Sequence, residues 1–196
     1  MYIYSEMRII AGAKRGMKLL SPESDISRPI TDRVKESLFS VLYKYDLPAG
    51  KMAADIFAGV GSLGLEALSR GAEFVTFIEQ DPRIIATLKK NIEKADFVQR
   101  SKVIRGNTFK IGAPVDKQKY DLVFVDPPYS LTKNVQQGSL LWGLLVLLSE
   151  QVVADGIVVV RTYKDTELLE QYSQLRIIDR RKWGSMAVSI LQRTNI

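Results

Sequence analysis

Short apolar runs alternate with longer segments whose apolar residues recur at helical spacing, from Lys51 to the C-terminus. Runs of this length, rich in Val, Ile and Phe and bounded by Gly, Pro or Asp, are typical of buried strands. They predict strands at MAADIFA (52–58), FVTFIE (74–79), KVIRGN (102–107), YDLVFVD (120–126) and GIVVVRTY (156–163).

The segments between these runs predict helices. The clearest helix spans residues 82–95, with Asp81 as its N-cap and Pro82 at its first helical position. Further helices are predicted at 61–70, 139–150 and 166–172. Alternating strands and helices predict a mostly parallel sheet covered on both faces, which is a Rossmann-like α/β sandwich.

Two smaller regions flank this sandwich. The final segment, LRIIDRRKWGSMAVSILQR, predicts an antiparallel hairpin whose strands join around Trp183. Near the other end, a helix is predicted at 32–45, followed by a Pro-Ala-Gly linker (48–50). The inward face of that helix is formed by Val34, Leu38, Val41, Leu42 and Tyr45. We therefore divide the chain into an N-terminal extension of hairpin and helix (1–48) and a sandwich domain (49–196).

The chain contains no cysteine and no histidine among its 196 residues. A disulfide framework, a thiolate nucleophile and an imidazole base are therefore excluded. A transition-metal site is not expected, because zinc and its neighbours favour imidazole and thiolate ligands. A hydrophobic share of 46% at this length fits one well-packed domain with a small appendage.

Neither the N-terminus nor the apolar runs indicate a membrane protein. The segment MYIYSEMRIIAGAKRG lacks the residue order of a signal peptide. The longest apolar run, LLWGLLVLL (140–148), is far shorter than the roughly 20 residues of a membrane span. We expect a soluble cytoplasmic protein without a membrane partner.

Basic residues form two clusters in a chain whose formal net charge is +6. The first consists of Arg8, Lys14, Arg15 and Lys18, and the second of Arg176, Arg180, Arg181 and Lys182. A solvated surface explains either cluster by itself. Contact with a polyanionic partner is the alternative, and the choice between the two explanations depends on whether both clusters flank a site.

The first predicted strand runs into DIFAGVGSLG, in which Gly59, Gly61 and Gly64 satisfy the pattern G-x-G-x-x-G. Glu79 ends the second predicted strand, and a carboxylate there can accept hydrogen bonds from a ribose diol. A tight strand-to-helix turn and a strand-terminal acid are the plainer explanation. If a cofactor binds here, Glu79 does not distinguish a nicotinamide dinucleotide from S-adenosylmethionine, since both carry adenosine.

The fourth predicted strand ends in Asp126, Pro127, Pro128 and Tyr129, directly after its apolar core. Two successive prolines fix two φ angles and remove two N–H donors, so they end the strand ladder and leave rigid carbonyl acceptors. A stiff strand-to-loop turn explains this arrangement. A site for a group that donates hydrogen bonds explains it equally well.

Asp55 and the tetrapeptide at 126–129 distinguish between a nicotinamide dinucleotide and S-adenosylmethionine as the cofactor. With D-x-F-x-G-x-G at 55–61 and Asp-Pro-Pro-Tyr after strand four, the sequence resembles the class I S-adenosylmethionine-dependent methyltransferases that act on amino groups. The resemblance implies S-adenosylmethionine as cofactor and a catalytic role for residues 126–129. It implies cofactor contacts at Asp55, Phe57, Gly59, Gly61, Glu79, Gln80, Asn107, Thr108 and Asp126. Many relatives have Asp where Asn107 stands, but an amide oxygen also accepts a hydrogen bond from the adenine amino group.

Methyl transfer to an amino group explains why the fourth predicted strand ends in prolines. An exocyclic amine conjugated to a base ring is a poor nucleophile, because its lone pair is delocalised. If the Asp126 carboxylate and the Pro127 carbonyl each accept one N–H bond, they orient the nitrogen toward the methyl group. Tyr129 would stack on the base, an interaction worth about 1–3 kcal/mol. Methyl transfer to pyrimidine carbon five is disfavoured, since its usual covalent route needs a cysteine.

The region before the sandwich narrows the range of possible substrates. MRIIAGAKRGMKL, followed by RPITDRVKESLFSVL, resembles the N-terminal signature of the RsmD family, the bacterial guanine-N2 methyltransferases of small-subunit (16S) ribosomal RNA. The resemblance continues through DIFAGVGSLGLEALSRGA, VDPPY and the C-terminal hairpin. It implies a ribosomal RNA or a small-subunit assembly particle as partner, a monomeric enzyme, and Arg28 and Thr31 near the cofactor. The residues expected to face RNA are Lys14, Arg15, Lys18, Arg180, Arg181 and Lys182. Thr31 also suits the N-cap of the following helix, and the two roles are compatible.

Other classes of protein remain open from the sequence. A DNA adenine-N6 methyltransferase shares both motifs but usually adds a target-recognition insertion, and a protein-glutamine methyltransferase usually has Asn where Asp126 stands. An NAD-dependent oxidoreductase leaves Pro127, Pro128 and Tyr129 without a role. An inert RNA-binding protein does not require Asp126.

Overall fold

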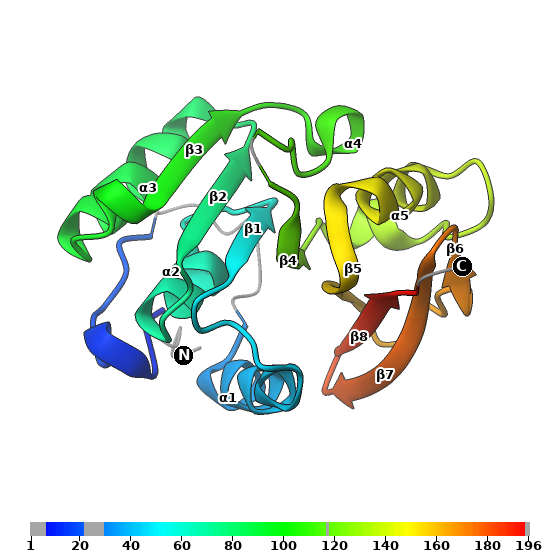
Figure 1. Cartoon of the computed structure of the whole chain (residues 1–196), viewed down its shortest axis with the longest axis horizontal. Coiled ribbons are helices and arrows are strands. Elements are labelled where there is room, and N and C mark those ends of the chain that lie inside the picture. The colour runs from blue at the N-terminus through cyan, green and yellow to red at the C-terminus, as the bar shows by residue number, and fades with distance from the viewer. Residues whose placement is uncertain (1–6, 22–29, 117, 195–196) are drawn as a thin grey trace, which may run out of the picture.

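An eight-stranded sheet forms the centre of the computed structural model, which describes residues 7–21, 30–116 and 118–194 (Figure 1). Its strands are β1 (Met52–Ile56), β2 (Phe74–Glu79), β3 (Ser101–Arg105), β4 (Tyr120–Val125), β5 (Val152–Tyr163), β6 (Gln171–Tyr172), β7 (Leu175–Trp183) and β8 (Met186–Arg193). The order across the sheet is β3-β2-β1-β4-β5-β8-β7-β6. β1 to β5 are parallel, and β8, β7 and β6 continue the sheet with antiparallel pairing. The predicted α/β sandwich with a C-terminal antiparallel hairpin is confirmed.

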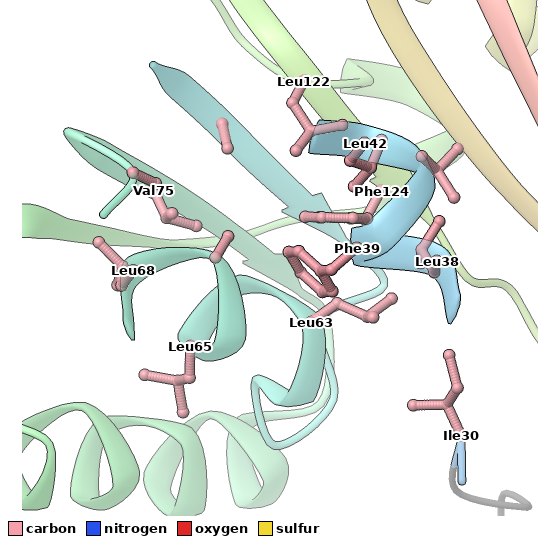
Figure 2. Close-up of a cluster of buried hydrophobic side chains, with 14 of the residues drawn as sticks. Ile30, Leu38, Phe39, Leu42, Leu63, Leu65, Leu68, Val75, Leu122 and Phe124 are labelled. Atoms are coloured by element: carbon pink, nitrogen blue, oxygen red, sulfur yellow. The ribbon is translucent and has the colours of Figure 1, made fainter. Parts of the chain in front are cut away.

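Helices cover both faces of the sheet. They are α1 (Asp32–Leu42), α2 (Ser62–Ser69), α3 (Pro82–Lys94), α4 (Thr108–Ile111) and α5 (Leu140–Gln151), with short 3-10 turns η1 (Gly12–Lys14), η2 (Tyr43–Tyr45), η3 (Val98–Arg100) and η4 (Tyr129–Thr132). Side chains alternate between faces along a strand. Accordingly, Leu122 and Phe124 of β4 join the hydrophobic cluster of α1, α2 and α3, whereas Val123 joins the cluster of α5. Figure 2 shows Phe39 of α1 beside Phe124, and their ring centroids are 5.8 Å apart.

Most predicted elements lie where the sequence pattern placed them. Asp81 caps α3 by accepting a hydrogen bond from the Arg83 N–H, and Pro82 is the first helical residue. The predicted helix at 32–45 is α1 followed by η2, and α5 is capped by Ser139. β5 starts four residues before the predicted strand, at Val152, and the pairing register of β4 and β5 shifts there.

The predicted helix at 166–172 is wrong. This segment is extended, and its last two residues form β6. Leu168 and Tyr172 are buried at a spacing that suits a helix, but an extended chain also buries both. Its backbone is held by distant groups, since the Arg180 guanidinium donates to the carbonyls of Lys164 and Thr166. The predicted strand at 102–107 ends earlier, at Arg105, and the short helix α4 follows it.

The N-terminal extension contains the predicted hairpin. The Ile9 N–H donates to the Met17 carbonyl at 2.9 Å, and the Leu19 N–H donates to the Met7 carbonyl at 2.8 Å. Gly12, at the tip, has φ +78, and a Cβ there would lie 1.8 Å from the Ser69 carbonyl oxygen. Only glycine allows the hairpin to approach α2 this closely.

Buried polar side chains of the sandwich hold this hairpin. The Glu66 carboxylate, which is fully buried, accepts hydrogen bonds from the Ile10 and Ala11 N–H groups at 2.8 and 3.0 Å. Glu66 also pairs with Arg70 at 2.8 Å and with the buried Lys35 of α1 at 3.7 Å. The extension and the sandwich therefore share one core across the proposed boundary at residue 48.

Two further polar residues complete the docking of the hairpin. The buried Asn91 of α3 accepts from the Leu20 N–H at 2.7 Å and donates to the Leu20 carbonyl at 3.0 Å. Ser69 of α2 accepts from the Lys14 N–H at 2.9 Å and donates to the Ala11 carbonyl. Among the helices of the described ranges, none is long and apolar enough to cross a bilayer.

Candidate active site at the carboxyl end of the sheet

The predicted cofactor and catalytic residues meet where β1, β2 and β4 end. β1 is the central strand of these three and pairs in parallel with both neighbours. The chain crosses from β3 back over the sheet to β4, so strand order reverses between β1 and β4. In open parallel sheets, ligands bind at the carboxyl end of the strands at such a switch point. We call this side of the sheet its carboxyl end, and the opposite side its amino end.

The glycines after β1 have different roles. A Cβ at Gly59 (φ +54) would meet no other atom within 4 Å, so this position faces open space where a ligand can approach the backbone. A Cβ at Gly61 (φ +90) would lie 2.6 Å from a Leu88 side-chain atom, and one at Gly64 would lie 2.3 Å from the Phe77 ring. Gly61 and Gly64 therefore permit close packing of the turn and of α2.

Asp55 lies beneath this turn. It is 2% exposed, and its carboxylate accepts a hydrogen bond from the Gly64 N–H at 2.8 Å. Burial raises the pKa of Asp55 to about 8, although the Gly64 hydrogen bond acts in the opposite direction. In this structure Asp55 fixes the start of α2 from below, and its direct contact with a cofactor stays a prediction.

Glu79, at the end of β2, is oriented by backbone donors. One carboxylate oxygen accepts from the Gly59 N–H at 3.0 Å, and the other accepts from the Gln80 and Asp81 N–H groups at 2.8 and 3.0 Å. A carboxylate offers about four acceptor positions, so roughly one remains for a ribose hydroxyl. The predicted contact with both hydroxyls of a ribose would need one of these backbone bonds to give way. Gln80 is exposed next to it.

Asn107 and Thr108 lie after β3, at the start of α4. Asn107 is exposed, and its side-chain oxygen caps α4 by accepting from the Phe109 N–H at 3.0 Å, while Thr108 is buried. Phe57 and Phe109 meet edge to face, with ring centroids 5.1 Å apart. This partly exposed aromatic pair, which the sequence pattern did not reveal, forms an apolar wall between the glycine turn and α4.

Asp126 follows β4 and forms an ion pair with Arg161 of β5. The Arg161 Nε donates to the Asp126 Oδ1 at 2.5 Å, and the two side chains are 10% and 19% exposed. Burial raises the pKa of Asp126, and the charge and hydrogen bond of Arg161 partly offset this rise. Arg161 also lies over the Tyr129 ring, 5.8 Å from its centroid.

The two prolines set the course of the chain after Asp126. The Pro128 carbonyl accepts from the Leu131 N–H at 2.9 Å and so begins η4, whereas the Pro127 carbonyl takes no part in that turn. Pro127 is buried and Pro128 is exposed. Thr132 donates to the Tyr129 carbonyl at 3.0 Å and fixes the Tyr129 backbone. The loop thus holds Asp126, Pro127 and Tyr129 in place together.

The tip of the predicted RNA-binding hairpin lies at the opposite end of the sheet from these residues. The Lys14 N–H bonds Ser69 at the end of α2, and its ammonium lies 5.8 Å from the centroid of the Phe97 ring, which precedes β3. α2 runs back from the carboxyl end of β1, so its last residue marks the amino end of the sheet. Arg15 and Lys18 are exposed on the same hairpin.

Three residues of the C-terminal basic cluster, Arg180, Arg181 and Lys182, lie at the carboxyl end instead, whereas Arg176 lies near the start of β7 at the amino end. β7 runs parallel to β5, because each of them is antiparallel to β8. Arg180 is engaged with the Lys164 carbonyl, and Arg181 pairs with Asp179 at 3.1 Å. Lys182 is exposed. The two basic clusters therefore do not flank one small site.

Two other predictions concern the cofactor and metal ions. Arg28 lies outside the described residues, and Thr31 caps α1 by accepting from the Val34 N–H at 3.4 Å. Within the described ranges, no three acidic side chains gather in a way that would hold a metal ion.

Arg161 is the site residue that the sequence pattern missed. The only local signal was a basic residue inside the apolar strand GIVVVRTY. Its partner, Asp126, stands 35 residues earlier, and only the pairing of β4 with β5 brings the two together.

The glycine turn after β1 and the Asp-Pro-Pro-Tyr loop after β4, on a sheet of this order, define a class I methyltransferase sandwich. A solved structure from Escherichia coli, described as “Putative methyltransferase yhhF”, covers 97% of this chain and 99% of its own, with TM-score 0.79 and 31% identity. An RNA methyltransferase from Salinibacter ruber, solved with S-adenosyl-L-homocysteine, shares the fold with TM-score 0.63 at 15% identity, over 86% of this chain and 95% of its own.

Sequence comparison identifies the family. A family model described as Conserved hypothetical protein 95 matches residues 7–192. The ribosomal RNA small subunit methyltransferase D of Haemophilus influenzae is 38% identical over 166 residues, which cover 84% of this chain and 82% of that protein. Its counterpart in Escherichia coli K12 is 41% identical over 124 residues, 63% of this chain and 61% of that protein. The chain belongs to this family, the RsmD family, as its sequence resemblance implied.

Proposed function

We propose that this protein transfers a methyl group from S-adenosylmethionine to the exocyclic N2 amine of a guanine in small-subunit ribosomal RNA. The observation that carries the proposal is the Asp126 carboxylate, fixed by Arg161 next to the glycine turn at the carboxyl end of the sheet. The names of the relatives from Haemophilus influenzae and Escherichia coli support ribosomal RNA of the small subunit as the substrate.

The residues at the carboxyl end fit the cofactor. The open face of Gly59 admits a ligand against the backbone, and the partly exposed Phe57 and Phe109 rings offer an apolar surface to a flat adenine. Glu79 keeps acceptor capacity for a ribose hydroxyl, and Gln80 is exposed beside it. S-Adenosylmethionine supplies an electrophilic methyl group when it is bound.

Arg161 is a positioning residue in this proposal. It occupies Oδ1 of Asp126, which leaves Oδ2 to accept one N–H of the guanine amine, and the Pro127 carbonyl accepts the other. The positive charge of Arg161 favours the ionised carboxylate against the effect of burial. The nitrogen would form its bond to the methyl group as the methyl–sulfur bond breaks, and it would then release one proton to water. The Asp126 carboxylate stabilises the positive charge on that nitrogen until the proton leaves.

Holding the amine in line with the methyl group is the main catalytic task of this chain. Positioning of reactants contributes about 7–11 kcal/mol in well-oriented reactions. The rigid loop after β4 suits this task, since two prolines and the η4 turn fix its backbone. Tyr129 lies under the Arg161 guanidinium that pairs with Asp126, and it offers a ring to the base.

The remaining parts of the proposal concern the setting of the reaction. We propose a monomer that acts in the cytoplasm on ribosomal RNA or on a small-subunit particle. The extension (1–48) presents Lys14, Arg15 and Lys18 to RNA, and residues 49–196 carry the transfer reaction. Their common core supports a fixed arrangement of these two parts.

The experiment that tests the function uses a methyl-labelled cofactor. The protein is incubated with unmodified small-subunit ribosomal RNA, small-subunit particles, DNA or protein, and the labelled product is identified. N2-methylguanine in ribosomal RNA is the expected product. Methylated adenine in DNA or methylated glutamine in protein would assign the chain to another substrate class, and no transfer at all would refute an enzymatic role.

Two substitutions separate the roles of the site residues. Asp126→Ala is expected to abolish methyl transfer and to leave cofactor affinity within a few-fold of the parent value. Asp121→Asn is the matched control for this variant. Asp121 lies at the amino end of β4, where it accepts from the Met52 N–H. Glu79→Ala should weaken cofactor binding by about 1.5–3 kcal/mol in calorimetry. Near-normal turnover of Asp126→Ala would eliminate its proposed role.

A further inference from the structure

A row of paired residues connects Asp126 to the C-terminal hairpin. Arg161 of β5 pairs directly with Val188 of β8, and Val188 pairs with Arg181 of β7. Directly paired residues project from the same face of a sheet. Arg181 therefore lies on the face that carries the ion pair of Asp126 and Arg161, two strands farther along.

On this face, the next row toward the carboxyl end is aromatic at both ends. Tyr163 of β5 pairs with Met186 of β8, and Met186 pairs with Trp183 of β7, so all three share the same face. Tyr163 is 40% exposed, and its ring centroid lies 6.0 Å from that of Tyr129 at an interplanar angle of 66°. Two strand spacings separate Tyr163 from Trp183, which is roughly 10 Å.

The turn that carries Trp183 is tied to the loop after β5. The Lys164 N–H donates to the Ser185 carbonyl at 3.0 Å, and the Arg180 guanidinium bonds the carbonyls of Lys164 and Thr166. These bonds hold β5 and the β7–β8 turn in one arrangement. A surface fixed in this way loses little conformational entropy when a partner binds.

A basic side chain accompanies these rings on the same face. The side chain of Arg181 is 38% exposed beside Asp179, whereas Lys182, between Arg181 and Trp183, projects from the opposite face. Aromatic rings with neighbouring cations are the combination that binds single-stranded nucleic acid, because bases stack on the rings and phosphates pair with the cations. Charge and aromatic surface together therefore favour a nucleic acid over a protein partner at this turn.

From this arrangement we infer that Tyr163, Trp183 and Arg181 form a binding strip for the RNA nucleotides that flank the target guanine. The strip begins beside Tyr129 and leads away from Asp126 along the carboxyl end of β5, β8 and β7. It deepens the proposed function, on which it rests, by naming the surface that holds the substrate next to its reacting base.

The first test uses the fluorescence of Trp183. The chain has two tryptophans, so Trp142→Phe leaves Trp183 as the single emitter. A hexamer of uridine, added without cofactor, is expected to quench this emission as a base stacks near the ring. Unchanged emission at saturating RNA would remove Trp183 from the strip and overturn the inference. Stronger quenching by the matching deoxythymidine hexamer, or by polyglutamate, would overturn the choice of RNA as partner.

The second test uses Tyr163, whose ring is more exposed. Tyr163→Ala should weaken binding of the uridine hexamer by roughly fivefold to a hundredfold, as expected when one base loses its stacking partner. Tyr163→Phe keeps the ring and should bind like the parent. Tyr43→Ala is the matched control, because Tyr43 is also exposed, at 49%, but lies at the amino end near Arg70.

Kinetics distinguish this inference from the proposed function. Tyr163→Ala should raise KM for ribosomal RNA and leave kcat near the parent value, with unchanged melting temperature and cofactor affinity. Equal hexamer binding by the Ala, Phe and parent proteins would refute the strip even if methyl transfer to RNA is observed. Absence of methyl transfer by the parent, with intact hexamer binding, would instead refute the proposed function.

Discussion

At the amino end of the sheet, the buried Glu66 carboxylate has two backbone N–H donors and two cationic neighbours, Arg70 and Lys35. At the carboxyl end, the equally buried Asp55 accepts from the Gly64 N–H, and burial raises its pKa to about 8. Asp126 pairs with Arg161, and its pKa is also raised. Both ends therefore bury carboxylates, but Glu66 has more hydrogen-bond donors and cationic partners than Asp55 or Asp126 has.

This difference separates structure from function within one domain. A buried charge with enough partners fixes the packing of the elements that supply them, as Glu66 does for the hairpin and α1. A buried carboxylate with few partners remains ready to accept hydrogen bonds from a ligand, and perturbed pKa values of this kind gather at functional sites. The same contrast applies to the basic hairpins, of which one is docked through its backbone at the amino end, and the other pairs with β5, the strand that carries Arg161.

The largest expected effect is a loss of stability when the Glu66 carboxylate, with its many partners, is removed. Glu66→Ala leaves two N–H groups and the charges of Arg70 and Lys35 without their common partner. We expect a loss of about 3–5 kcal/mol in the free energy of unfolding, measured with urea. Glu36→Gln is the matched control, since its side chain is 57% exposed where it pairs with Arg70, and it should cost less than about 1 kcal/mol. Equal losses for both variants would contradict the structural role of Glu66.

The next largest effect is on kcat, and it concerns Asp126, which is buried with few partners. Arg161→Gln should lower kcat by roughly tenfold to a hundredfold, because Asp126 loses both its orientation and the charge that favours its ionised form. The pKa of Asp126 then rises further, so the acid limb of the kcat–pH profile should move to higher pH.

Two further variants show whether Arg161 acts through Asp126. Arg161→Lys keeps the charge and should restore part of the activity. Arg193→Gln removes an arginine that bonds Gln174 and Val152 at the amino end, and it should leave the profile in place. If the acid limb of the kcat–pH profile stays in place in Arg161→Gln, the role of Arg161 is structural only.

Asp55 gives a smaller effect at neutral pH but a distinct effect on how stability depends on pH. Its folded-state pKa is raised from 3.8 to about 8, so folding favours the protonated form. The stability that this protonation contributes is present in full below the unfolded-state pKa of 3.8, and it is lost progressively as pH rises to about 8. Asp55→Asn should cost less than about 1 kcal/mol at neutral pH and should remove this part of the pH dependence in urea titrations. A decline of the same size in the variant would contradict the raised pKa.

The smallest effects compare the two basic clusters. Neutralising Lys182 and Arg181 should flatten the salt dependence of RNA affinity by a slope of about 0.7 for each phosphate that is no longer neutralised, even for a short oligonucleotide. Neutralising Lys14, Arg15 and Lys18 should do so only for full-length ribosomal RNA, because this hairpin lies at the other end of the sheet. Cofactor affinity is the control in both cases. Parallel salt slopes for parent and hairpin variant on full-length RNA would exclude the hairpin from RNA binding.

Local sequence was sufficient for most of the fold. The strand and helix periods, the Asp81 cap and the glycine turn are set by neighbouring residues, so they are visible in the chain itself. The segment 166–172 is different, because its extended form depends on Arg180 of a later strand. A spacing of four between Leu168 and Tyr172 suits a helix as long as that distant partner is unknown.

The site was predictable as a set of strand ends but not as a set of interactions. The order of motifs placed Asp55, Glu79 and Asp126 at one end of a parallel sheet. Sequence alone did not reveal that Glu79 is bonded to the Gly59 backbone or that Arg161 reaches Asp126. Both hydrogen bonds join a residue on one strand to a residue that directly follows another strand, and the register of the sheet decides them.

The short strand β6 has a consequence for self-association. It pairs with Leu175 and Arg176 at the start of the nine-residue β7, so much of the outer margin of β7 lies beyond it. An open strand margin is a template on which a second copy of a chain can add its own strand, and closely spaced charges oppose that addition. The charged run of β7 consists of Asp179, Arg180, Arg181 and Lys182. Replacing these cations with apolar residues would therefore favour β-sheet polymerisation, so the chemistry that suits a polyanion also keeps the protein dispersed at high concentration.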